Sequence, residues 1–139
     1  MRLVKVRQLF PKWMRLFLRV CAAYHVGWAI ILLILKDNYV KWITDSYTSG
    51  FFQIELHAIG LFVLGLIFIL TSFFPIRFWY LIAFGFVAKT FGGIAVYYSI
   101  MDQTITLQFI VHLLVNDLSW AVVLGMITYE AFSLYKLVD

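Results

Sequence analysis

Charged residues and cysteines are scarce in this chain, and each scarcity excludes a class of protein. Only 13% of the 139 residues are charged and 64% are apolar, whereas soluble domains carry about a quarter charged residues and about half apolar ones. The single cysteine, Cys21, excludes an internal disulfide. The sequence also lacks the motifs for covalent haem attachment, zinc peptidases and phosphate-binding loops. We therefore predict one transmembrane domain covering residues 1–139.

Four apolar stretches are long enough to cross a bilayer. They lie at about 16–35, 51–73, 78–100 and 104–126, and about 20 apolar residues span a hydrocarbon core of about 30 Å. Only a few residues around Pro75 separate the second stretch from the third, so these two are predicted to be antiparallel neighbours. The polar segment 36–50 is predicted to be a loop. The predicted fold is an all-α, integral membrane four-helix up-and-down bundle.

The N-terminal segment is basic and also apolar. Residues 1–19 contain no acidic residue and six basic ones: Arg2, Lys5, Arg7, Lys12, Arg15 and Arg19. This pattern predicts an amphipathic segment at anionic lipid headgroups. The apolar run that follows is too long for a cleaved signal peptide and lacks its small-residue cleavage pattern. Basic residues beside apolar spans set orientation, so we expect both termini in the cytoplasm and no nucleic-acid partner.

Two charged residues lie deep inside the predicted spans. Lys89 is near the middle of the third span and Asp117 near the middle of the fourth. An isolated carboxylate at that depth costs at least roughly 2.5 kcal/mol. Pairing the two charges is the least costly way to keep both, so an intramembrane Lys89–Asp117 ion pair is predicted. Such a pair either serves a function or only fixes the register of the helices.

Polar and small residues around this pair recur at helical spacing. Gln108, His112, Asn116 and Trp120 follow one another every four residues, which predicts one polar stripe on the fourth span. Asp117 points about 100° away from Asn116, toward a different neighbour. On the third span, the residues predicted to allow close helix packing are Gly85, Gly92 and Gly93.

Three histidines give an alternative hypothesis. His25 falls near mid-depth, while His57 and His112 fall in the outer half of the bilayer and could meet there. Two such imidazoles could hold a b-type haem, or the group could bind a quinone. Three hydrogen-bonded histidines in a helical bundle are the favoured explanation, because spacing alone is weak evidence for a ligand set, so no metal or cofactor is predicted. Ser119, His112 and Asp117 cannot form a catalytic triad, because Ser119 and His112 lie about 10 Å apart along one helix.

Two short motifs resemble those of a protein family. Lys89-Thr-Phe-Gly92-Gly93 and Asn116-Asp117-Leu-Ser-Trp120, with the turn Pro75-x-Arg77-x-Trp79, resemble motifs of small four-span bacterial inner-membrane proteins of unknown function. Some of those proteins are labelled alkyl hydroperoxide reductases, but this chain has no peroxidatic cysteine motif. The resemblance covers about residues 51–125, and Gly93 stands where the family has proline. It implies that Lys89, Gly92, Asn116, Asp117 and Trp120 belong together in a protein of the bacterial inner membrane.

These observations favour a non-catalytic membrane protein. The midplane cluster would bind a small solute, an ion or a proton, or hold the chain in a larger membrane complex or homo-oligomer. The alternatives are a redox protein that binds haem or quinone through His25, His57 and His112, and a purely structural accessory subunit.

Overall fold

The chain is helical throughout the part that is described, as predicted. The computed structural model describes residues 9–44, 51–92, 94–95 and 106–137, and no β-strand occurs in these ranges. The α-helices are α2 (Lys12–Ile34), α3 (Lys36–Thr44), α4 (Phe51–Phe73), α5 (Trp79–Val87), α7 (Leu107–Leu113) and α8 (Ser119–Tyr135). Two π-helical segments complete the list: η1 (Ala88–Gly92) continues α5, and η2 (Leu114–Leu118) joins α7 to α8.

Among the described residues, three helices are long and apolar enough to cross a membrane: Lys12–Ile34, Ile54–Phe73 and Leu107–Tyr135. Within the predicted third span, 78–100, the structure has a shorter helix, which consists of the nine residues of α5 and the five residues of η1. Together they rise roughly 21 Å, less than a hydrocarbon core of about 30 Å. Residues 96–100 of that prediction lie outside the described residues.

The N-terminal helix extends beyond the predicted span, 16–35, at its start. Lys12 is already the first residue of α2, directly after Pro11, whose φ of −56° and ψ of 132° are not helical. Proline suits this position, because its missing N–H and fixed φ cost a helix little at its start. Half of the predicted amphipathic segment therefore belongs to α2 itself, and residues 1–8 lie outside the described residues.

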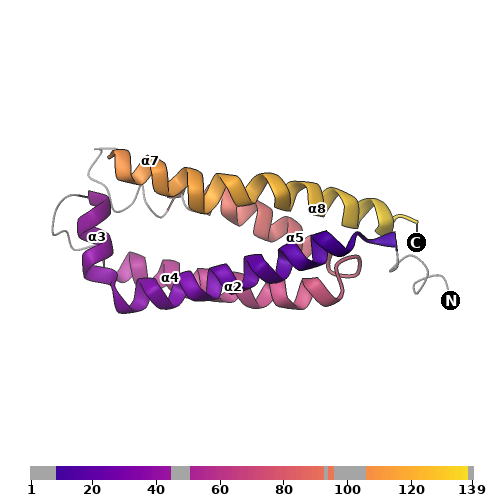
Figure 1. Cartoon of the computed structure of the whole chain (residues 1–139), viewed down its shortest axis with the longest axis horizontal. Helices are drawn as coiled ribbons and strands as arrows, with labels where there is room; N and C mark the ends of the chain where they lie inside the picture. Colours follow the sequence, from indigo (N-terminus) through magenta and orange to yellow (C-terminus); the bar gives the residue numbers. More distant parts are fainter. Residues whose placement is uncertain (1–8, 45–50, 93, 96–105, 138–139) are drawn as a thin grey trace.

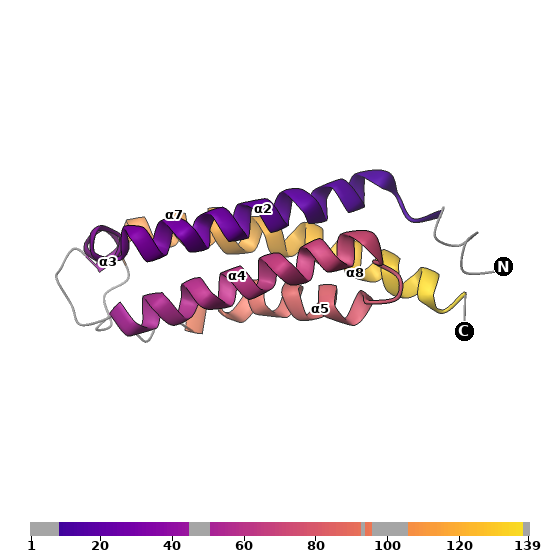
Figure 2. The same ribbon diagram turned by 90° about the horizontal axis from the view of Figure 1, so that it is seen from below.

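The prediction of a loop at 36–50 was wrong for its first part, which forms α3. This helix lies across the ends of the long helices (Figures 1 and 2). Its polar composition hid a short apolar face, Tyr39 and Val40, which is buried. Asp37 in the first turn and Lys41 in the last also suit the helix dipole. A strongly polar segment can thus be helical when one face meets the core.

The long helices pack in two close pairs. α2 lies along α4, and α5 lies along α8, with α4 and α5 joined by the tight turn at Pro75–Phe78 (Figures 1 and 2). A Cβ atom added at Gly65 would lie 2.6 Å from Cγ2 of Val26, so α2 and α4 approach closely there. A Cβ added at Gly85 would lie 2.5 Å from the Phe68 ring. Gly85 therefore leaves room for the ring of Phe68 between α4 and α5.

Buried apolar side chains form two clusters, one toward each end of the molecule. In the first, Phe10 before α2 and Ile76 in the α4–α5 turn join Leu134 near the end of α8. The second surrounds Tyr39 of α3 and contains Leu32, Ile54 and Phe109. Between these two clusters lies the polar group described next.

Candidate functional site

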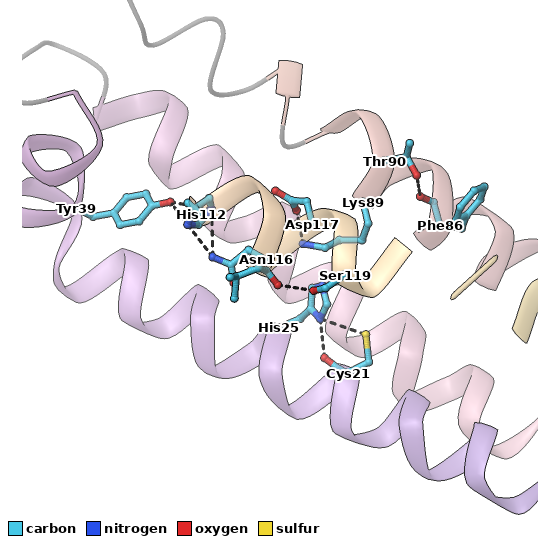
Figure 3. A network of polar contacts seen from close by, with 11 residues as sticks. Cys21, His25, Tyr39, Phe86, Lys89, Thr90, His112, Asn116, Asp117 and Ser119 are labelled. Carbon is cyan, nitrogen blue, oxygen red and sulfur yellow. Dashed lines mark hydrogen bonds and ion pairs between the residues drawn. The ribbon is translucent and has the colours of Figure 1, made fainter. Parts of the chain in front are cut away.

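The two charged side chains predicted to pair are in direct contact. Nζ of Lys89 lies 2.6 Å from Oδ1 of Asp117, and the two side chains are only 4% and 3% exposed (Figure 3). The second carboxylate oxygen, Oδ2, is buried and has no hydrogen-bond partner among the described residues. The carboxylate thus keeps one acceptor atom available at the core of the protein.

Both members of the pair lie in π-helical segments. Lys89 belongs to η1 and Asp117 to η2, and these two segments contact each other. A π segment inserts one extra residue into an α-helix and is found frequently at functional sites. The insertion also changes which side chains face inward, so that both Asn116 and Asp117 are buried although they are adjacent in sequence.

Asn116 and Asp117 address different neighbours, as the 100° between them predicts. Whereas Asp117 meets Lys89, the amide nitrogen of Asn116 lies 2.7 Å from Nδ1 of His112. The hydroxyl of Tyr39 lies 3.0 Å from Nε2 of the same ring. These contacts fit a tautomer in which Asn116 donates to Nδ1 and Nε2–H donates to Tyr39. His112 is thereby held between α3 and η2.

His25, on α2, belongs to a separate part of the core, between α4 and α8. Its Nδ1 lies 2.6 Å from the carbonyl oxygen of Cys21, one helical turn earlier, so Nδ1–H donates to that carbonyl (Figure 3). Its Nε2 is buried without a hydrogen-bond partner among the described residues. The ring is fully buried and is packed between Phe68, at 5.3 Å, and Trp120, at 6.0 Å. His25 and His112 therefore have different partners.

A partly open cavity of about 320 Å³ lies beside the ion pair. Lys89 and Asp117 form part of its wall, together with His57 of α4. The remaining wall is almost entirely apolar and consists of Leu56, Gly60, Leu61, Val63, Leu64, Phe84, Ala88 and Gly92.

Several predicted site residues lie elsewhere. The predicted polar stripe was wrong at its first residue, because Gln108 is exposed. Residues four apart on an α-helix are offset by about 40° around the helix axis. The buried face of that turn is centred on Phe109 instead. Trp120 packs on α2, 4.7 Å from the ring of Tyr24. Gly92 faces open space, so its predicted packing role was wrong, and Gly93 lies outside the described residues.

Two residues of the site were missed by sequence reasoning. Tyr39 was expected in an interfacial loop, but it is 8% exposed and bonds to His112. Gly60 lines the cavity, and a Cβ added there would meet nothing within 4 Å. A glycine inside an otherwise apolar helix was the available signal for Gly60, since it often marks a packing or functional position.

The geometry brings no metal-binding set together within the described ranges. No group of three His, Cys, Asp or Glu side chains there is placed to hold a metal ion. Comparison with protein-family models, with curated proteins and with solved structures finds no match. The function is therefore argued from the site alone.

Proposed function

We propose that this chain is a four-span integral membrane protein whose Lys89–Asp117 pair forms the centre of a non-catalytic binding site for a small solute, an ion or a proton. The proposed arrangement is an up-and-down bundle in a bacterial inner membrane. Support for the membrane comes from the three long apolar helices and from the many large apolar side chains on their outer faces. The resemblance of the Lys89 and Asn116-Asp117 motifs to small four-span membrane proteins agrees with this proposal.

One observation carries the binding-site proposal: a buried carboxylate that uses only one of its two oxygens. Oδ1 of Asp117 meets Lys89, while Oδ2 has no hydrogen-bond partner in the described part of the chain. A buried acceptor without a partner costs about 1–3 kcal/mol or more when it is charged. If the pair served only to fix the register of the helices, leaving this acceptor without a partner would bring no benefit. A ligand, an ion or a proton would satisfy the atom.

The competing structural role is tested with three variants of the purified protein. Lys89→Met and Asp117→Asn each leave one partner buried and unpaired, which typically costs about 3–5 kcal/mol. The double variant leaves no charge at this position and is expected to be at least as stable as the wild type, because replacing both partners of a buried pair is often neutral or stabilising. Equilibrium unfolding in detergent measures all four proteins. A double variant less stable than both single variants would contradict this account of the pair. A double variant that behaves like the wild type in binding as well as in folding would show that the pair is a structural element only.

A redox protein is the second candidate, and one atom favours it. Nε2 of His25 is buried and has no partner among the described residues, so it is available as an axial ligand. The rings of Phe68 and Trp120, however, occupy the space around His25, and His112 is held by Tyr39 and Asn116. The present geometry therefore fits a haem less well than a small ligand at Asp117. Visible absorption of the purified protein tests this, because bound haem gives a Soret band.

The outer surface of the helices also indicates what the chain contacts. Its exposed apolar side chains suit contact with acyl chains or with other membrane helices. We propose that the chain works as a homo-oligomer or within a larger membrane complex.

A further inference from the structure

The cavity beside the ion pair has a composition that restricts what it can bind. Its volume of about 320 Å³ is at the lower end of the roughly 300–1,000 Å³ usual for ligand sites, so it suits a small molecule or the head of a larger one. Apart from Lys89, Asp117 and His57, its wall is apolar. The bulk of an occupant must therefore be apolar.

The cavity opens toward the outer surface of the helices. Three of its lining residues are strongly exposed: Leu56 at 58%, Val63 at 47% and Phe84 at 55%. In the proposed membrane protein this surface contacts acyl chains. A molecule dissolved in the bilayer would enter directly between α4 and α5.

Two polar groups at the inner wall define the head of the ligand. Oδ2 of Asp117 is a buried acceptor without a partner among the described residues, so the ligand must supply a hydrogen-bond donor. Lys89 has three N–H donors and uses one on Oδ1 of Asp117, so it can also donate to a ligand oxygen. A hydroxyl group satisfies both, because it donates one hydrogen bond and accepts others. The two charges already neutralise each other, so a charged head would remain uncompensated.

We propose that this cavity binds a neutral, lipid-soluble molecule through a hydroxyl group that donates to Asp117 and accepts from Lys89. The inference rests on the proposed function and names the ligand class of the same site. Hydroxyl groups of this kind occur on reduced quinones and on diacylglycerols, and the structure specifies the chemistry that they share.

The test uses the full-length protein in nanodiscs of phosphatidylcholine, a lipid without a hydroxyl group. The probe is a ten-carbon alcohol that carries a photoreactive diazirine, and its methyl ether is the matched control. We expect the alcohol to label peptides of α4 and α5 roughly tenfold or more above the ether, the factor that a hydrogen bond to a charged group supplies. In the Lys89→Met, Asp117→Asn double variant, the alcohol and the ether should label equally.

A second variant separates loss of binding from loss of folding. Gly60→Leu places a side chain at the cavity wall where the structure has open space. The protein should unfold at or above the wild-type temperature, because leucine favours a helix more than glycine does, while labelling falls about tenfold. Gly27→Leu is the control, because Gly27 also faces open space but does not line the cavity. Equal loss of labelling in both variants would contradict binding in this cavity.

Competition identifies the source of the hydroxyl. Displacement of the probe by decylubiquinol but not by its oxidised form, which has no ring hydroxyl, assigns a quinol; displacement by diolein assigns a glyceride. Displacement by neither, or equal labelling by the alcohol and the ether in the wild type, would overturn the inference. That result would not contradict the proposed binding site for an ion or a proton, because the stability test of the double variant does not use the probe.

Discussion

His112 connects two parts of the chain that are distant in sequence. The hydroxyl of Tyr39, 73 positions earlier, lies 3.0 Å from the imidazole, and Asn116 contacts its other nitrogen. All three side chains are buried. This small network fixes α3 against the start of the fourth apolar helix, so it positions the segment that carries Asp117.

Tyr39→Phe is expected to destabilise the protein by about 0.5–1.5 kcal/mol, because the buried hydrogen bond between Tyr39 and His112 is lost. Equilibrium unfolding in detergent measures this change. Tyr129→Phe is the matched control, since Tyr129 is 73% exposed and loses the same atom; its effect should stay within about 0.5 kcal/mol. Equal effects at the two positions would show that the Tyr39–His112 contact contributes nothing.

The contact between Lys89 and Asp117 was predictable at the residue level, whereas the Tyr39–His112 contact was not. Each of two opposite charges inside apolar segments is costly to bury alone, so the free-energy cost of burial is enough to predict that they pair. A tyrosine in a polar segment carries no such constraint, because water at the membrane interface satisfies it equally well. Only the folding of α3 against the bundle places Tyr39 next to His112.

At the scale of helices, length and apolar content predict the existence of the elements but not their internal geometry. The second and fourth spans were placed within a few residues of the start of their helices. The π segments η1 and η2 were missed, because a shift from i−4 to i−5 hydrogen bonding leaves no signature in composition. The same applies to α3, in which Tyr39 and Val40 are buried within an otherwise polar segment.

Gly65 shows how closely two of the helices approach. Gly65→Ala is expected to destabilise the protein by about 1–3 kcal/mol, because the new Cβ would lie 2.6 Å from Val26 Cγ2 and 3.2 Å from the Ala22 carbonyl oxygen, and valine has little freedom to move aside. Gly27→Ala makes the same change where nothing lies within 4 Å. It should stabilise the protein by up to about 1 kcal/mol through helix propensity. Thermal unfolding that moves in the same direction for both variants would contradict this packing.

At the scale of the whole molecule, the two ends differ in charge. The first core cluster places Lys12, Arg77 and Lys136 near one end, because each lies within two residues of Phe10, Ile76 or Leu134. At the other end, the ammonium of Lys36 is engaged by Glu55 at 2.6 Å, which raises the pKa of Lys36. An excess of lysine and arginine marks the cytoplasmic side. The proposed orientation therefore puts Lys136 inside and α3 outside.

Single cysteines report this orientation, because the natural Cys21 is fully buried and should stay unlabelled. In intact bacterial spheroplasts, a membrane-impermeant maleimide is expected to label Lys41→Cys on α3. It should label Lys136→Cys only after the membrane is permeabilised. Both side chains are exposed, so the two positions differ only in the side of the membrane on which they lie. The opposite pattern would invert the topology. Labelling of both variants in intact spheroplasts would place α3 and the end of α8 on one side, and the long helices would then not cross the bilayer.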